Sequence, residues 1–195
     1  MIHLVRHGET DGNQSHYVGR RDLPLNAVGQ AQAKALVPEL SERPIRAIVA
    51  SPLQRAQATA QPLALRLGLP VRTEMALIEF DFGMLQDLPK SGHQADLRKN
   101  HQRVPVPGGE SLMDVWMRLL PFAQDTMADG ARFGDLVIVG HYWSNRLLRG
   151  QFLGLSFEDT LKCRDYKPKT GSVLSFKATK GAPPLTADAS SVTRL

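Results

Sequence analysis

The chain has 195 residues, enough for one well-buried core. Hydrophobic residues make up 42% and charged residues 22%, which is typical of globular proteins, and no apolar stretch approaches the ~20 residues needed to cross a bilayer. The formal net charge is +5, but the basic residues are scattered without interleaved aromatic residues, so a nucleic-acid partner is the weaker interpretation and no membrane partner is expected.

The first residues, MIHLV, are typical of a strand. They lack the charged start, the long apolar run and the small-residue cleavage site of a secretory leader. The single cysteine, Cys163, cannot form an internal disulfide and has no companions that would suggest a zinc or redox motif. We therefore expect a cytoplasmic protein.

Short apolar or β-branched runs predict strands, and longer helical patterns separate them. The predicted strands cover residues 2–5, 46–50, 71–75, 135–140 and 171–176. This alternation is typical of an α/β sheet.

The first two helices have clear boundary residues. The first is expected to begin near Asn26, which can cap it, and to continue to Leu40. For the second helix, Ser51 is the predicted cap, Pro52 fits the first turn, and Gly68 follows the last apolar residue.

Later in the chain, residues 111–129 predict a third helix, kinked at Pro121, and residues 142–153 predict a fourth. Between the third strand and the third helix, glycine, proline and polar residues dominate residues 80–110. We expect this segment to cross the edge of the sheet and cover a site. Apolar content falls after residue 176, so residues 177–195 predict a weakly structured C-terminal tail.

Reactive side chains occur where the predicted strands end. Arg6 and His7 end the first strand, and His141 directly follows the strand at 135–140. Glu79 comes just after the third strand, and Arg55 lies in the first turn of the second helix. In doubly wound sheets, ligands bind beyond the carboxyl ends of the strands, so we expect these side chains to converge there.

Arginines, histidines and a carboxylate together suit phosphoryl transfer, which depends on positioning and charge stabilisation. The guanidinium groups of Arg6 and Arg55 match the geometry of phosphate oxygens and keep their charge. Nearby cations disfavour a proton on His7, which leaves a neutral imidazole able to attack phosphorus. Glu79 would protonate the leaving oxygen and then activate water. His141, if protonated, would add a third positive donor.

Ordered segments of the chain resemble landmarks of the histidine phosphatase superfamily, which contains cofactor-dependent phosphoglycerate mutases, α-ribazole phosphatases and broad-specificity phosphatases. Between residues 2 and 176 these segments are LVRHGETDGN, SPLQRAQATA, LIEFDFG, PGGES and VGHYWSNRLL. The resemblance implies a three-layer α/β/α sandwich with a mostly parallel central sheet and an active site at its carboxyl end. Residues 1–176 would then form a single catalytic domain.

The resemblance also implies roles for individual residues. His7 would be the phosphorylated nucleophile and Glu79 the proton donor and acceptor. Neither a metal nor a cofactor is expected, because side chains supply the positive charge. The phosphate pocket would contain Arg6, Asn13, Arg55 and His141, with backbone amides near Gly19, and Asn13 and Gly19 are also ordinary turn residues. Apart from the resemblance, Gly8 directly follows His7 and lets the backbone turn closely around an anion.

Two assignments remain open at the level of the sequence. Asp81 lies two residues after Glu79, and either carboxyl could face the site, although Glu79 occupies the acid position of the resembling segment. Tyr142 and Trp143 follow His141, where members of the superfamily commonly carry small residues. They are either core residues or an aromatic wall for a substrate.

Together these features predict a metal-independent phosphatase that hydrolyses a small phosphorylated metabolite. One alternative is phosphoryl transfer of the phosphoglycerate mutase type. Superfamily mutases usually carry a longer covering segment than residues 80–110, which favours hydrolysis. Another alternative is a non-catalytic domain that binds a phosphorylated ligand. The sequence leaves a homodimer open.

Overall fold

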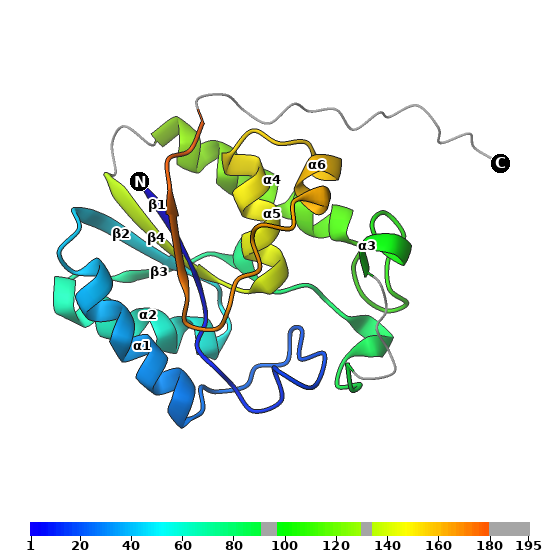
Figure 1. Cartoon of the computed structure of the whole chain (residues 1–195), viewed down its shortest axis with the longest axis horizontal. Coiled ribbons are helices and arrows are strands. Elements are labelled where there is room, and N and C mark those ends of the chain that lie inside the picture. Colours follow the sequence, from blue (N-terminus) through cyan, green and yellow to red (C-terminus); the bar gives the residue numbers. More distant parts are fainter. Residues whose placement is uncertain (91–96, 130–133, 180–195) are drawn as a thin grey trace.

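The structure, a computed structural model, describes residues 1–90, 97–129 and 134–179. Within these residues, five strands form one sheet in the order β3-β2-β4-β1-β5 (Figure 1). The strands are β1 (Ile2–Arg6), β2 (Ile45–Ala50), β3 (Val71–Thr73), β4 (Asp135–Gly140) and β5 (Val173–Phe176).

The sheet is mostly parallel, as predicted. Strand β4 pairs in parallel with both β1 and β2, and β2 pairs in parallel with β3. Of the five described strands, only β5 pairs antiparallel, with β1, at one edge of the sheet. The carboxyl ends of β1, β2 and β4 therefore lie together at one end of the sheet.

Helices cover both faces of this sheet (Figure 1). Neighbouring residues of β2 show the two layers, because Ile48 packs into the core under α1 and α2 whereas Val49 belongs to the core under α4 and α5. None of the helices in the described ranges is both long and apolar enough to cross a lipid bilayer. The helices are α1 (Ala27–Leu40), α2 (Gln54–Leu67), α3 (Leu97–Asn100), α4 (Leu112–Asp129), α5 (Tyr142–Phe152) and α6 (Phe157–Lys162).

The caps at Asn26 and Gly68 are confirmed. The side chain of Asn26 accepts a 2.9 Å hydrogen bond from the Gly29 amide, and Gly68 ends α2 with a φ of 64°. The predicted cap at Ser51 is wrong. Helix α2 begins later, at Gln54, and its N-cap is Leu53, whose side chain forms no capping hydrogen bond. The hydroxyl of Ser51 contacts His141 instead, so a contact between distant segments replaces the expected local one.

Strand β3 is shorter than predicted. It ends at Thr73 because Glu74 caps a short 3-10 turn, η1 (Met75–Leu77), where its carboxylate accepts the Ala76 amide at 3.1 Å. The chain is thereby turned toward Glu79.

The covering segment contains a second 3-10 turn, η2 (Gly83–Leu85), and the short helix α3, which the sequence pattern did not predict. Its first part lies along residues 15–17. The Tyr17 amide donates to the Leu88 carbonyl at 3.1 Å, and the Lys90 amide donates to the Ser15 carbonyl at 2.8 Å. Residues 91–96 of this segment, and residues 180–195 of the predicted tail, lie outside the described residues.

Candidate active site

A cavity of about 570 Å³ lies at the carboxyl end of β1, a size that suits a small metabolite. Segments from distant parts of the chain meet here, as expected from the reactive side chains at the ends of the predicted strands. Its walls include the predicted site residues Arg6, His7, Asn13, Gly19, Arg55 and Glu79.

His7 is buried and carries its hydrogen on a defined ring nitrogen. Nδ1 lies 2.7 Å from the Gly8 carbonyl, which can only accept, so Nδ1 bears the hydrogen and Nε2 keeps its lone pair. Burial, followed by the charges of Arg55 and Arg6, holds the pKa of His7 well below the usual 6.5. The ring is therefore neutral at neutral pH, with a lone pair on Nε2.

His141 packs directly against His7. The ring centroids are 5.0 Å apart, with the ring planes at 57°. The His141 side chain is fully buried, is not among the residues that line the cavity, and places Nε2 2.7 Å from the Ser51 hydroxyl. Burial and the charge of Arg55 hold its pKa well below 6.5, so the free site contains a neutral second histidine.

Arg6 and Arg55 line the cavity, and each has a buried donor nitrogen without a partner among the described residues. Arg55 uses its terminal nitrogens on the carbonyls of Arg21 and Gly19, at 2.6 and 2.7 Å, and Arg6 donates to Pro168 at 2.9 Å. Their buried Nε atoms have no hydrogen-bond partner within the described ranges. Burial lowers the pKa of Arg55 to about 10, so its charge persists at neutral pH. These unsatisfied donors suit an anion.

Asn13 and the two predicted glycines serve this site differently. The buried amide of Asn13 also has no partner among the described residues and lines the cavity. Gly19 has a φ of 53°, and a Cβ there would lie 2.8 Å from the Phe82 ring. A Cβ at Gly8 would lie 2.5 Å from the Gly29 carbonyl oxygen, so Gly8 permits close packing of the loop after β1 against α1.

Glu79 is held by the start of α5. Its carboxylate accepts the backbone amides of Tyr142 at 2.9 Å, Trp143 at 3.2 Å and Ser144 at 3.4 Å. Amides in the first turn of a helix have no partner within the helix and need such an acceptor. Because His141 is the residue that precedes α5, one helix start fixes both the carboxylate and the second histidine.

The structure separates the two acids that the sequence left open. Asp81 does not line the cavity, and it forms an ion pair with Arg20 at 3.4 Å. Glu110, from the PGGES segment, accepts from Arg20 at 2.6 Å, from Arg118 at 3.0 Å and from the Asp81 amide at 3.1 Å. Arg118 also donates to the Glu79 carbonyl at 3.2 Å, so this network anchors the backbone that carries Glu79.

The two aromatic residues after His141 have different places. Trp143 is 8% exposed and belongs to the core beneath α4 and α5, although it reaches the cavity wall. Tyr142 is less buried, lines the cavity, and lies with its ring centroid 5.6 Å from the guanidinium carbon of Arg6. Trp143 is thus mainly a core residue, and Tyr142 forms an aromatic wall.

Sequence reasoning missed several residues at this site. Lys90 lines the cavity, donates to the Asn13 carbonyl at 2.5 Å, and has a pKa lowered by burial and by Arg6. Lys169 also lines the cavity. Neither lysine belongs to one of the recognised segments, so no sequence signal pointed to them. Ser51 does lie in such a segment, but its position before a helix resembled a cap.

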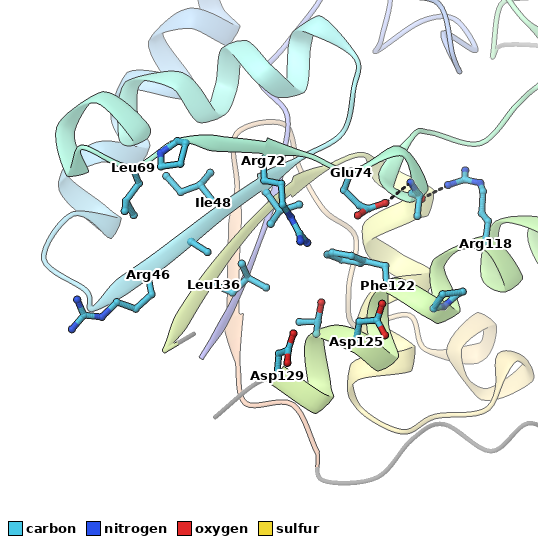
Figure 2. A pocket seen from close by; sticks show the side chains of 16 residues that line it. Arg46, Ile48, Leu69, Arg72, Glu74, Arg118, Phe122, Asp125, Asp129 and Leu136 are labelled. Atoms are coloured by element: carbon cyan, nitrogen blue, oxygen red, sulfur yellow. Dashed lines mark hydrogen bonds between the residues drawn. The ribbon is translucent and has the colours of Figure 1, made fainter. Parts of the chain in front are cut away.

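A second cavity, of about 440 Å³, lies between β2, β3 and the second half of α4 (Figure 2). Arg72 lies over the Phe122 ring, 6.0 Å from its centroid, and Asp125 and Asp129 face the opposite strands. No histidine is among the described residues that line this cavity, so His7 and the unpaired Nε donors of Arg6 and Arg55 single out the cavity at the end of β1.

Comparison with known proteins identifies the family. The family model described as histidine phosphatase superfamily (branch 1) matches residues 2–187. The chain belongs to the histidine phosphatase superfamily. Its mostly parallel sheet and helical layers are the phosphoglycerate mutase-like fold that the sequence resemblance implied.

Superfamily members with solved structures share this fold. A mycobacterial glucosyl-3-phosphoglycerate phosphatase is 30% identical, with a TM-score of 0.74 over 83% of this chain and 82% of that chain. A putative α-ribazole-5'-P phosphatase from Escherichia coli K-12 is 25% identical, with a TM-score of 0.75 over 88% and 87%. A 2,3-bisphosphoglycerate-dependent phosphoglycerate mutase of Brucella anthropi is 35% identical over 82% of this chain and 84% of the relative. Both phosphatases and mutases are therefore among its relatives.

Proposed function

We propose that this histidine phosphatase superfamily member is a metal-independent phosphatase that hydrolyses a small phosphomonoester through a phosphohistidine on His7. The observation that carries the proposal is the neutral His7 imidazole, whose Nε2 lone pair is free beside the unsatisfied donors of Arg6 and Arg55. Side chains thus supply both the nucleophile and the positive charge that the phosphoryl group needs.

The reaction has two steps on the same carboxyl group. In the first, His7 Nε2 forms a bond to phosphorus, the bond from phosphorus to the ester oxygen breaks, and Glu79 gives its proton to the leaving alcohol. In the second, Glu79 takes a proton from water, the water oxygen bonds to phosphorus, and the bond to His7 breaks. Inorganic phosphate leaves, and both residues regain their starting forms.

Hydrolysis is favoured by the solved relatives with phosphatase names, and by the short covering segment between Glu79 and the PGGES segment. The 35% identity to a phosphoglycerate mutase favours the second candidate, in which the phosphoryl group passes to another hydroxyl. The two functions share His7 and differ in the acceptor, which is water in one case and an alcohol in the other.

A panel of phosphorylated metabolites, scored by release of inorganic phosphate, tests the proposal. Wild type should hydrolyse at least one ester, whereas His7→Ala should lose the activity and His101→Ala, outside the cavity, should keep it. Turnover that survives His7→Ala would remove His7 from the mechanism. A chelator should leave the rate unchanged.

The mutase alternative has its own assay. The protein is supplied with 3-phosphoglycerate and 2,3-bisphosphoglycerate, and both isomerisation and phosphate release are followed. Isomerisation without phosphate release would replace the hydrolase proposal with phosphoryl transfer. Phosphate release without isomerisation would support hydrolysis.

A further inference from the structure

Ser51 has no exposed side-chain surface, and the start of α2 does not account for its position. It directly follows β2, and its amide donates to the Val139 carbonyl of β4 at 2.9 Å. The backbone is therefore fixed between two central strands. From there the hydroxyl reaches across to a residue 90 positions later in the chain, His141.

The contact with His141 is short and buried on both sides. Ser51 Oγ lies 2.7 Å from Nε2, and the other ring nitrogen of His141, Nδ1, has no hydrogen-bond partner among the described residues. On its other side the His141 ring meets His7, with 5.0 Å between centroids. Ser51 is thus the side chain that fixes how the second imidazole lies against the nucleophile.

A hydroxyl is well suited to this task because it has one hydrogen to donate and two lone pairs to accept. It can bind Nε2 in either tautomer of the neutral ring. It can also accept from Nε2 if His141 gains a proton when a phosphoryl group arrives. An alanine at this position would leave a buried ring nitrogen without a partner and the ring free to turn.

We propose that Ser51 is a positioning residue for phosphoryl transfer, and that its hydroxyl holds the His141 imidazole in the orientation that His7 and its phosphoryl group require. The inference rests on the proposed function. It goes beyond that function by assigning a role to a side chain that does not line the cavity.

If Ser51 had a purely structural role, the important contact would be a different one. The Leu53 amide lies 3.4 Å from Ser51 Oγ, at the start of α2. If this long contact were the important one, replacing Ser51 would act through α2 and the stability of the fold, whatever residue occupied position 141. The experiment must therefore separate an effect through His141 from an effect through α2.

The first measurement compares Ser51→Ala with Ser51→Thr, which keeps the hydroxyl, using an aryl phosphate as substrate. Ser51→Ala should lower kcat by roughly ten- to hundredfold with little change in KM, as expected for a misplaced catalytic group. Ser51→Thr should recover much of the loss. Ser156→Ala removes the hydroxyl that caps α6, which does not line the cavity, and should keep wild-type kcat.

A double-mutant cycle with His141→Ala gives the decisive readout. If Ser51 acts through His141, adding Ser51→Ala to His141→Ala should cause no further loss of kcat. If Ser51→Ala lowered kcat by the same factor with His141 present and with His141→Ala, the proposal would be overturned. A wild-type kcat in Ser51→Ala would overturn it as well.

A spectroscopic arm keeps the test independent of turnover. In protein with ¹⁵N-labelled histidine, Ser51→Ala should shift the ring-nitrogen resonances of His141, while Ser156→Ala should not. Unchanged His141 resonances would overturn the proposal even if activity fell. If wild type hydrolysed no phosphate ester, the proposed function would fail, and the resonances alone would then decide whether Ser51 holds His141.

Discussion

The backbone amide of Gly8 donates a 2.9 Å hydrogen bond to the side-chain oxygen of Thr59, and both residues are buried. The same hydroxyl donates to the Arg55 carbonyl at 2.7 Å. One side chain therefore fastens α2, which carries Arg55, to the loop that carries His7. His7, the proposed nucleophile, and Arg55, a proposed phosphate ligand, are held in a fixed relation by this link.

Replacing Thr59 by valine tests the link, because valine keeps the shape and removes the hydroxyl. The Gly8 amide would then be buried without a partner, which should lower the free energy of unfolding by about 1–3 kcal/mol. The catalytic rate should fall by roughly ten- to hundredfold as His7 and Arg55 lose their fixed spacing. Urea unfolding and steady-state kinetics measure the two effects. Unchanged kcat in a folded variant would show that the link is not needed for activity.

Replacing the carboxyl of Glu79 should affect hydrolysis strongly, whereas replacing that of Asp81 should not. Glu79→Gln keeps the side chain at the start of α5 but cannot donate or take up a proton, so hydrolysis should fall by roughly 10²- to 10⁴-fold. Asp81→Asn lies outside the cavity and should stay within a few-fold of wild type. With an ester whose leaving group needs no proton, only the first step should recover in Glu79→Gln, so a burst of released alcohol should precede slow turnover. Equal losses in both variants would contradict the assignment of the acid.

The sequence predicted which side chains converge wherever the ends of strands determine their place. Arg6 and His7 had to lie at the carboxyl edge of the sheet once IHLV was assigned to a parallel strand, and His141 followed from DLVIVG in the same way. Even without further information, parallel pairing brings such residues together. The same reasoning located the cavity.

The errors have a common physical cause. Ser51 and Pro52 have the local sequence of a helix start, yet the partner of Ser51 is a histidine 90 positions away. Glu110 likewise acts through Arg20 and Arg118, from distant segments. Local sequence patterns encode caps and periodicity, but they do not encode which side chains meet after the fold closes.

The two buried histidines should make stability depend on pH. Burial lowers the pKa of both His7 and His141 well below 6.5, so below that pH the unfolded chain binds protons that the folded chain does not. The free energy of unfolding should therefore decrease as the pH falls from about 6.5 toward the folded-state pKa values. Denaturant unfolding between pH 7 and pH 5 measures this slope.

Replacing both histidines is the control for this pH dependence. Arg55, Arg6 and, for His141, Arg118 all act to lower these pKa values. A His7→Asn/His141→Asn double variant should have a shallower slope between pH 7 and pH 5. A slope as steep as that of wild type would place the responsible groups elsewhere, with His3 as the next candidate because burial lowers its pKa too.

Tyr142 should limit the size of the ester that reaches His7. Its ring forms a wall of the cavity and lies beside Arg6, while its backbone amide binds Glu79, a contact that any replacement except proline retains. Tyr142→Ala should raise kcat/KM for a naphthyl phosphate relative to a small alkyl phosphate by roughly tenfold. Tyr142→Phe keeps the ring and should keep the wild-type ratio. If alanine left the ratio unchanged, the covering segment rather than the aromatic wall would determine which esters enter.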